Sequence, residues 1–221
     1  MHLEKTMTFK KIGLDAMLTP DNCALILIDH QPFQANGVKN IDVGIMINNV
    51  VALAKAAKAF NVPTLLTSVL KDRGGDIFKQ LTDVFPEQVP IDRTFINTWE
   101  DERCVEWARK TGRKKLVFAA LWTEVCLAFP VIHALDDDYE VYFVTDASGG
   151  TTVEAHEMGI QRMIQAGAVP LTTVVFLSEL QRDWAREGDA AKTAEIILQH
   201  GGASATALAW ELQLLNAGKS A

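Results

Sequence analysis

The sequence predicts an α/β fold in which a six-stranded parallel sheet is covered by helices on both faces. Short apolar runs alternate with longer segments of helical period, which is the pattern of repeated βα units. Each run is largely apolar, as expected for a strand with helices on both sides of the sheet. The runs occupy residues 24–28, 63–68, 115–121, 140–145 and 171–176, with a weaker one at 90–95.

Four segments between these runs have the apolar spacing of helices. They cover residues 43–60, 99–109, 125–135 and 153–166. In the first segment, Val50, Val51 and Leu53 contribute to the apolar face. Pro130 is compatible with the third helix because proline costs little near a first turn. A threonine directly before residue 153 can cap the fourth helix.

Two further helical stretches, 190–199 and 203–217, follow the last predicted strand. We therefore divide the chain into a main domain, residues 1–184, and a helical extension, residues 185–221. The extension has no strands to connect, yet it is rich in apolar residues, namely Ile196, Ile197, Leu198, Leu208, Trp210, Leu212, Leu214 and Leu215. It either folds back onto its own domain or packs against a neighbouring subunit, and we favour the subunit contact.

The composition argues against several classes of partner. The chain has 28 acidic side chains against 21 lysines and arginines, a formal charge of -7, so we expect no nucleic-acid partner. Three cysteines are an odd number without metal-type spacing, which argues against a disulfide framework. The first residues lack a secretory pattern and no apolar run has transmembrane length. We expect a cytoplasmic protein with no membrane partner.

Sequence signatures of cofactor binding are also missing. There is no Gly-x-Gly-x-x-Gly segment and no phosphate loop, so a nucleotide cofactor has little support. His30, His133, His156 and His200 are scattered over different elements and form no closely spaced pair. We therefore predict that the protein needs no cofactor and no metal.

Three polar residues are expected to meet at one edge of the sheet. Asp29 ends the first apolar run, Arg93 lies near the end of the weak run, and Cys126 follows the run at 115–121. The carboxyl ends of parallel strands meet at the same edge, where open α/β sheets bind their ligands. The sequence therefore places a candidate site at these three residues.

A cysteine at the end of a buried strand and the start of a helix suggests a nucleophile. Backbone N–H groups and the helix dipole favour the thiolate of Cys126, and Asp29 can take its proton and return it to a leaving amine. Arg93 would favour both negative groups by its charge. The backbone N–H groups of Trp122 and Cys126 can form an oxyanion hole.

Each of these residues also has a structural interpretation, which stays open. A buried cysteine commonly packs as a small hydrophobe, and we expect this of Cys23 and Cys104. An aspartate at a strand end is commonly a turn residue. Arg93 has nearby acidic residues, Asp92 and Glu100, with which it can pair on the surface.

Five segments of the chain resemble a known family. They are Ile-Leu-Ile-Asp-His-Gln at 26–31, Arg-Thr-Phe-Ile-Asn-Thr-Trp-Glu-Asp-Glu at 93–102, Thr-Glu-Val-Cys at 123–126, Val-Thr-Asp-Ala-Ser-Gly at 144–149 and Glu-Leu-Gln-Arg-Asp-Trp at 179–184. Together they resemble the isochorismatase-like cysteine hydrolases, and among these the YcaC-like branch. The resemblance extends over residues 18–184 with the segments in the same order.

The resemblance implies a Rossmann-like three-layer fold and a catalytic trio that falls on Asp29, Arg93 and Cys126. It also implies a cis peptide bond between Leu121 and Trp122 and a homo-oligomer, a tetramer or an octamer. Most of the wider family has lysine in place of Arg93. Nicotinamidases of the superfamily bind a metal through histidines, and the matching residues 68–75 contain none. True isochorismatases lack the cysteine, which argues against vinyl-ether hydrolysis.

Our hypothesis from the sequence is a cofactor-independent hydrolase that acts on a small-molecule substrate with an amide or related C–N bond. We expect Phe33, Phe95, Asn97 and Trp122 to line the substrate pocket. Two alternatives stay open. One is a related enzyme that cleaves another bond with a bystander thiol, and the other is a non-catalytic scaffold that assembles through the C-terminal helices.

Overall fold

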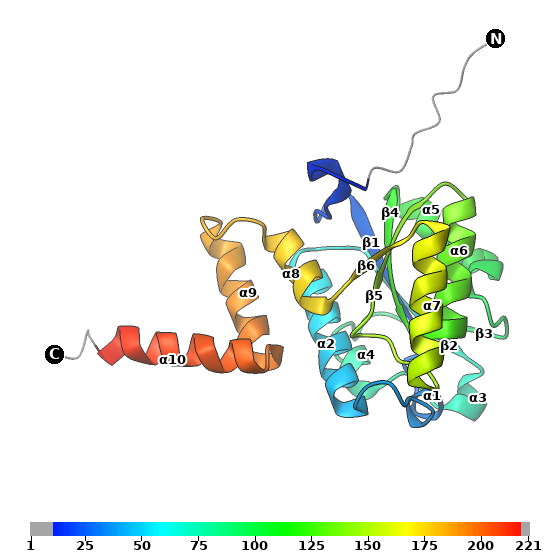
Figure 1. Ribbon diagram of the computed structural model, residues 1–221, viewed down its shortest axis with the longest axis horizontal. Helices are drawn as coiled ribbons and strands as arrows, with labels where there is room; N and C mark the ends of the chain where they lie inside the picture. Colours follow the sequence, from blue (N-terminus) through cyan, green and yellow to red (C-terminus); the bar gives the residue numbers. More distant parts are fainter. Residues whose placement is uncertain (1–10, 218–221) are drawn as a thin grey trace, which may run out of the picture.

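The computed structural model describes residues 11–217, and its centre is a parallel sheet of six strands (Figure 1). The strands are β1 (Cys23–Ile28), β2 (Thr64–Val69), β3 (Ile91–Arg93), β4 (Lys115–Ala120), β5 (Glu140–Val144) and β6 (Val169–Leu171). Their order in the sheet is β3-β2-β1-β4-β5-β6. The predicted fold class is confirmed. The expectation about a secretory signal falls mostly on residues 1–10, which lie outside the described residues.

The helices connect the strands and then continue beyond the sheet. They are η1 (Leu14–Ala16), α1 (Pro32–Asn36), α2 (Val43–Ala59), α3 (Lys71–Gly74), α4 (Lys79–Thr82), η2 (Thr98–Glu100), α5 (Glu102–Thr111), η3 (Thr123–Leu127), α6 (Ala128–Asp136), α7 (Val153–Ala166), α8 (Thr173–Gln181), α9 (Glu187–His200) and α10 (Ala203–Ala217). In residues 11–217, none of these helices is long and apolar enough to cross a membrane.

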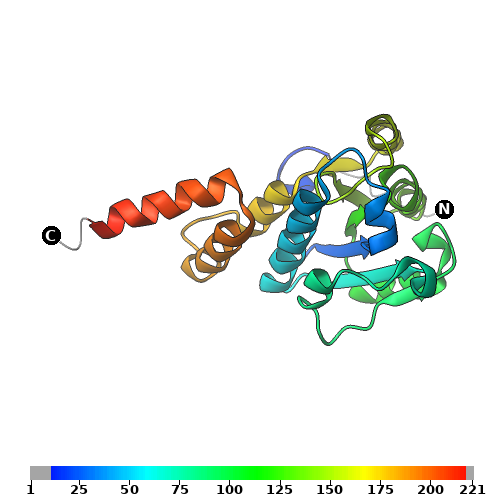
Figure 2. The same ribbon diagram turned by 90° about the horizontal axis from the view of Figure 1, so that it is seen from below.

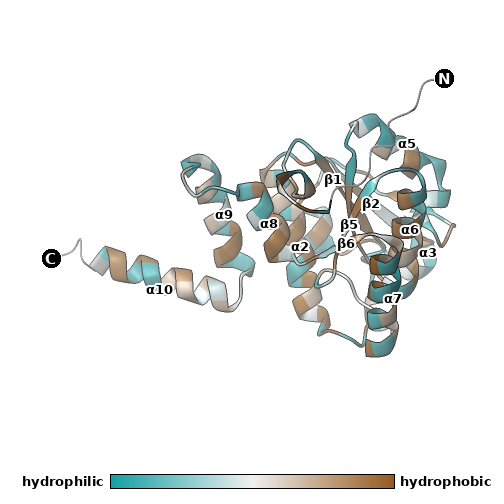
Figure 3. Cartoon of the chain, turned by 45° about the horizontal axis from the view of Figure 1, so that its top comes forward, coloured by the Kyte–Doolittle hydropathy of each residue, from teal (hydrophilic) through white to brown (hydrophobic). Residues whose placement is uncertain are grey.

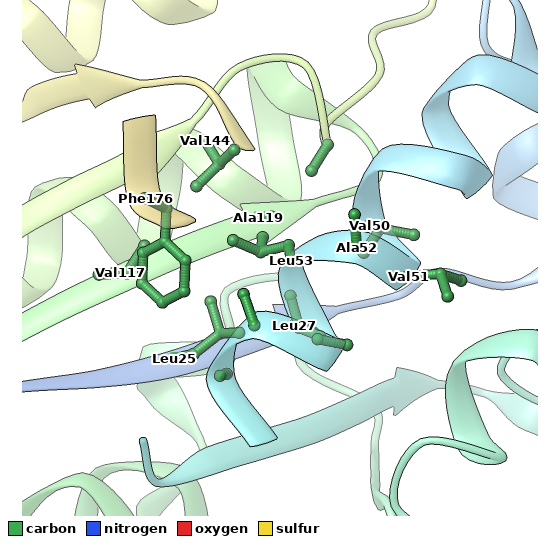
Figure 4. Close-up of a cluster of buried hydrophobic side chains, with 14 of the residues drawn as sticks. Leu25, Leu27, Val50, Val51, Ala52, Leu53, Val117, Ala119, Val144 and Phe176 are labelled. Atoms are coloured by element: carbon green, nitrogen blue, oxygen red, sulfur yellow. The ribbon is translucent and has the colours of Figure 1, made fainter. Parts of the chain in front are cut away.

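Alternate residues of each strand face opposite sides of the sheet, and each side has its own apolar core. Leu25 and Leu27 of β1 pack with α2 and with Phe176 of α8 (Figure 4). Ile26 and Ile28 of the same strand pack on the other side, against α5, α6 and α7. Burying a side chain of this size contributes about 1.5–3 kcal/mol, so the two cores fix the three layers.

The sixth strand is shorter than the sequence predicted. The run at 171–176 was expected to be a strand throughout, but β6 ends at Leu171 and α8 begins at Thr173. The carboxylate of Asp146 accepts hydrogen bonds from the backbone N–H and the hydroxyl of Thr173, at 2.8 and 2.9 Å. This acceptor satisfies an N–H at the start of the helix, so a long-range contact overrides the strand preference of the β-branched residues.

The two C-terminal helices behave differently from each other. Helix α9 packs against α2 and α8, and its Ile196 and Thr193 are buried. Helix α10 makes its main contacts with α9 and extends away from the sheet (Figures 1 and 2). Figure 3 shows that apolar residues occur along this projecting helix, and Trp210 is 64% and Leu214 is 74% exposed. Thus α9 folds back, whereas α10 leaves its apolar residues exposed.

Candidate active site

Asp29 lies immediately beyond the carboxyl end of β1, where the chain turns sharply. Its φ of 59° is in the left-handed region, which aspartate tolerates better than most residues. The Asp29 N–H donates to the carbonyl of Thr67 in β2 at 2.9 Å, and its own carbonyl accepts from Gln31 at 2.7 Å. The side chain is fully buried. The backbone turn therefore directs the carboxylate into the protein rather than into solvent.

Arg93 is the last residue of β3 and forms a buried ion pair with Asp29. One guanidinium nitrogen, Nη2, lies 2.6 Å from Asp29 Oδ2, and both side chains are fully buried. The other, Nη1, donates to the carbonyls of Phe95 and Ile96. The surface pairing of Arg93 with Asp92 or Glu100 is therefore wrong, because the guanidinium points inward and holds the carboxylate of Asp29.

Cys126 lies in η3, a single π-helical turn between β4 and α6. The turn is closed by hydrogen bonds from Leu127 N–H to the Trp122 carbonyl and from Ala128 N–H to the Thr123 carbonyl. The sequence predicted an ordinary first helical turn here, whereas α6 begins only after Cys126. The peptide bond between Leu121 and Trp122, just before the turn, is cis.

The thiol of Cys126 is close enough to Asp29 for each group to shift the pKa of the other through a side-chain hydrogen bond. Burial, and next the Asp29 carboxylate, raise the pKa of Cys126 to about 12, although Arg93 and the Trp122 N–H act in the opposite direction. The thiolate that the sequence was expected to favour is therefore disfavoured in this environment. Desolvation outweighs the charge of Arg93 and the Trp122 N–H.

Burial also raises the pKa of Asp29 to about 6, against the opposing effects of Arg93 and the Cys126 hydrogen bond. Near neutral pH the pair is therefore a carboxylate beside a protonated thiol. Within residues 11–217, Asp29 Oδ1 is a buried atom that has no partner meeting strict hydrogen-bond geometry. This oxygen is free to accept the thiol proton, which makes Asp29 a candidate general base.

The sequence pattern of the isochorismatase domain matches residues 23–174, a segment that contains Asp29, Arg93 and Cys126. The chain belongs to the isochorismatase family. It is 37% identical over 169 residues to the Escherichia coli protein named probable hydrolase YcaC, covering 76% of this chain and 81% of the relative. The resemblance to the YcaC-like branch is thus confirmed.

Solved structures agree with this membership. YcaC from Pseudomonas aeruginosa, solved with hexane-2,5-diol and covalent acrylamide, superposes with a TM-score of 0.83 at 34% identity, covering 87% of this chain and 95% of the relative. YcaC from Escherichia coli gives a TM-score of 0.85 at 34% identity, covering 90% and 97%, and is described as an octameric hydrolase of unknown specificity. The present chain is an isochorismatase-family hydrolase whose scissile bond these relatives leave open.

Two of the expected pocket residues, Phe33 and Trp122, lie together. The indole N–H of Trp122 donates to the Gln34 carbonyl in α1 at 2.7 Å, and the ring of Phe33 lies 6.3 Å from the indole. Gly37 approaches the indole so closely that a Cβ there would come within 2.7 Å of it. Helix α1 therefore fixes the Trp122 side chain. Phe33, at 62% exposure, and Phe95, at 46%, remain accessible to a ligand.

Asn97 has contacts that the sequence did not indicate. Its side chain caps η2 by accepting from Trp99 N–H at 3.0 Å, and its amide nitrogen lies 3.2 Å from both Glu100 and His133. It lines a surface hollow of about 680 Å³ between η2 and α6, together with Phe129. None of its hydrogen-bond partners is Asp29, Arg93 or Cys126. These contacts favour a structural role for Asn97 over a place in the substrate pocket.

Two polar side chains, Gln31 and His30, support the site, and the sequence analysis assigned neither of them a role there. Gln31 bridges to the end of β2 by accepting from Val69 N–H at 2.9 Å and donating to the Gly75 carbonyl. His30 is fully buried with Nε2 3.0 Å from the Ala147 carbonyl, and burial lowers its pKa to about 4. Their position directly after Asp29 was the available signal. In residues 11–217, no three His, Cys, Asp or Glu side chains are grouped to hold a metal ion.

Proposed function

We propose that the protein is a cysteine hydrolase that cleaves a small amide or a related C–N bond with Cys126, Asp29 and Arg93 and without a cofactor. The observation that carries this proposal is the arrangement of Asp29. One oxygen of its carboxylate is held by Arg93 at 2.6 Å, and the carboxylate is also coupled to the thiol of Cys126. A base, a proton donor and a fixed cation thus come together from three distant parts of the chain.

The reaction begins with transfer of the thiol proton to Asp29 while the Cys126 sulfur attacks the substrate carbonyl carbon. The carbonyl electron pair moves to oxygen, where the backbone N–H groups of Trp122 and Cys126 stabilise the negative charge. As the tetrahedral adduct collapses, the C–N bond breaks and the leaving amine takes the proton from Asp29. A thioester on Cys126 remains.

Water completes the cycle by attacking the thioester carbonyl while Asp29 takes one of its protons. Collapse of the second tetrahedral adduct breaks the C–S bond and releases a carboxylic acid, and the proton on Asp29 returns to the thiolate of Cys126. The net reaction is amide plus water to acid plus amine. Arg93 stays protonated throughout, so it orients the carboxylate and does not carry a proton.

Two properties of the relatives bear on the activity and the assembly that we propose. The Pseudomonas aeruginosa YcaC structure contains covalent acrylamide, so a small amide-bearing molecule can bond to that relative. The Escherichia coli YcaC structure is octameric. We extend the second property to this chain and propose a homo-oligomer, a tetramer or an octamer, in which residues 185–221 take part in subunit contacts.

The proposal is tested by screening small amides and ureas for ammonia release and by repeating the measurement with Cys126→Ala. We expect the variant to lose the activity by about 10³-fold or more, because the thiol that is proposed to form the thioester is removed. Cys104→Ala is the matched control, since Cys104 is also buried with its pKa raised to about 12. Equal turnover by wild type and Cys126→Ala would exclude the nucleophile.

A second candidate function follows from the pKa of Cys126. Burial also raises the pKa of Cys23 and Cys104 to about 12, so Cys126 does not differ from them in this respect. This observation favours a bystander thiol, either in an enzyme that cleaves another bond or in a non-catalytic scaffold. The first would retain turnover in Cys126→Ala, and the second would release ammonia from no amide in the screen.

A further inference from the structure

The turn that carries Cys126 is attached through its first residue to another part of the chain. Thr123, the first residue of η3, is fully buried. Its N–H donates to the Gly149 carbonyl at 2.9 Å, and its hydroxyl lies 2.8 Å from Nδ1 of His156 in α7. Both groups at the start of the turn are therefore bound to the segment that follows β5.

The second residue of the turn strengthens the same attachment. Glu124 Oε1 accepts hydrogen bonds from the N–H and the hydroxyl of Thr151, at 3.0 and 2.6 Å. Its other oxygen, Oε2, is buried, and in the described part of the chain no partner bonds to it. A buried carboxylate oxygen without a partner costs free energy, and the two hydrogen bonds that Thr151 donates to Oε1 offset part of this cost.

Helix α7 and its preceding loop pack too closely on the turn for it to shift. A Cβ added at Gly159 would lie 2.9 Å from the Cα of Glu124, and one added at Gly150 would lie 2.8 Å from both Glu124 Oε2 and the His156 Cβ. On the other side of the loop, a Cβ at Gly149 would lie 2.7 Å from Val38. The backbone of η3 is therefore in direct contact with α7.

The position of Thr123 determines the position of Cys126. The carbonyl of Thr123 accepts the hydrogen bond from Ala128 N–H that closes the π turn, and Cys126 lies inside this closed turn. A change in the side-chain contact of Thr123 is therefore transmitted to Cys126 through a turn of only five residues. The Glu124 contact with Thr151 resists the same movement.

We propose that His156 is a positioning residue. Its hydrogen bond with the Thr123 hydroxyl, together with the Glu124–Thr151 contact, holds the η3 turn so that the Cys126 sulfur faces Asp29. This inference deepens the proposed function and rests on it. Burial lowers the pKa of His156 below its ordinary value, so near neutral pH the imidazole acts as a neutral hydrogen-bonding group.

Loss of the His156–Thr123 contact has two opposite consequences for Cys126. The sulfur loses its base, so hydrolysis slows. At the same time the sulfur gains contact with water, and the pKa of the thiol falls from about 12 toward its ordinary value. Each unit by which the pKa falls increases the thiolate fraction at pH 8 about tenfold, so alkylation becomes faster.

The test compares Thr123→Val, His156→Ala and His156→Asn with wild type. The probe is iodoacetamide at pH 8, and mass spectrometry reads the alkylation rate of each cysteine separately. We expect Cys126 to react at least about tenfold faster in Thr123→Val and His156→Ala, with Cys23 and Cys104 unchanged. His156→Asn keeps a polar atom near the position of Nδ1, so it should restore a rate close to wild type.

Thr64→Val is the matched control. Thr64 is also a buried threonine whose hydroxyl is hydrogen-bonded, to the Val62 carbonyl at 3.1 Å, but it lies at the start of β2, away from the site. It should leave the alkylation of Cys126 unchanged. With a substrate from the amide screen, kcat of Thr123→Val should fall about tenfold while KM stays constant, because the lost contact affects the reacting sulfur.

Two results would overturn the inference. In one, Cys126 in Thr123→Val and His156→Ala keeps the wild-type alkylation rate. In the other, all three cysteines become faster together, which shows general loosening of the fold rather than release of one turn. Failure of the proposed function looks different, because Cys126→Ala would then hydrolyse amides as wild type does, while the labelling still reports on the turn.

Discussion

The carboxyl edge of the sheet and helix α10 differ in the side chains that they bury. At the sheet edge a carboxylate and a guanidinium, Asp29 and Arg93, have no exposed side-chain surface. On α10 the large apolar side chains of Trp210 and Leu214 are mostly exposed. Both arrangements are unfavourable for an isolated chain. The difference is the one that the proposed chemistry at the sheet edge and the proposed subunit contact of α10 would each require.

Among these charged and helical features, the largest effect should come from the buried carboxylate. We expect Asp29→Ala to reduce the proposed amide hydrolysis about 10²–10⁴-fold, because the proposed general base is gone. Leaving Arg93 buried without its partner should also lower the free energy of unfolding by about 3–5 kcal/mol. Hydrolysis assays and urea unfolding measure the two effects. Asp29→Asn keeps a hydrogen-bond acceptor for Arg93, so it should lose the activity with less loss of stability.

A surface pair provides the control for this prediction. Asp83 lies 2.6 Å from Lys79, the same distance that separates Asp29 from Arg93, but both side chains are largely exposed. Asp83→Ala should change the free energy of unfolding by less than about 1 kcal/mol and leave hydrolysis unchanged. Equal losses of stability at the two positions would contradict the assignment of a special role to the buried pair.

The pH dependence of hydrolysis should follow the ionisation of Asp29. Its pKa is raised to about 6, and only the carboxylate can accept the thiol proton. We therefore expect kcat/KM to increase about tenfold per pH unit below 6 and to become constant above it. A pH series with one amide substrate measures this. A profile governed by the thiolate of Cys126 would instead keep rising through pH 9, since the pKa of Cys126 is about 12.

Replacement of Arg93 by lysine should have an intermediate effect. Arg93 binds Asp29 and the carbonyls of Phe95 and Ile96 at the same time, whereas an ammonium group cannot reproduce this planar geometry. We expect Arg93→Lys to lower the free energy of unfolding by about 1–3 kcal/mol while part of the activity remains, because the charge beside Asp29 is retained. Arg93→Met should lose more activity than Arg93→Lys, and the reverse order would contradict an electrostatic role.

The smallest effect on monomer stability should come from α10. A chain that ends at Gly202 removes a helix whose main contacts are with α9, so we expect its unfolding midpoint to change little. Light scattering should show a smaller assembly than the full chain forms. A chain that ends at Trp184 also loses α9 and the buried Ile196, so it should be clearly less stable. An unchanged assembly in the chain ending at Gly202 would exclude α10 from subunit contacts.

Much of the fold could be predicted because it depends on local patterns. Continuous apolar runs predicted the strands, and the helix at 153–166 was predicted with the bounds that α7 has. The error at residues 173–176 arose because Asp146, 27 residues earlier in the chain, provides the acceptor that starts α8. The sequence pattern of residues 171–176 alone does not indicate such a contact.

The candidate site was predictable in its members but not in its electrostatics. Asp29 follows an apolar run directly and Cys126 lies in the first turn after another, so their place at the sheet edge could be inferred from position alone. The ion pair between Arg93 and Asp29 joins residues 64 positions apart, and the surface interpretation of Arg93 could not be excluded without that contact. Asn97 was expected in the pocket, but its side-chain contacts became visible only in the structure.

The sequence by itself determined the order of the strands and helices and the three residues that reach one edge of the sheet, because these depend on apolar periodicity and on the parallel arrangement of βα units. Only the tertiary structure decided the protonation states of those residues and the exposure of α10. Both depend on how much water reaches each group and on which distant side chains lie against it. At Cys126, desolvation raises the pKa more than the charge of Arg93 lowers it.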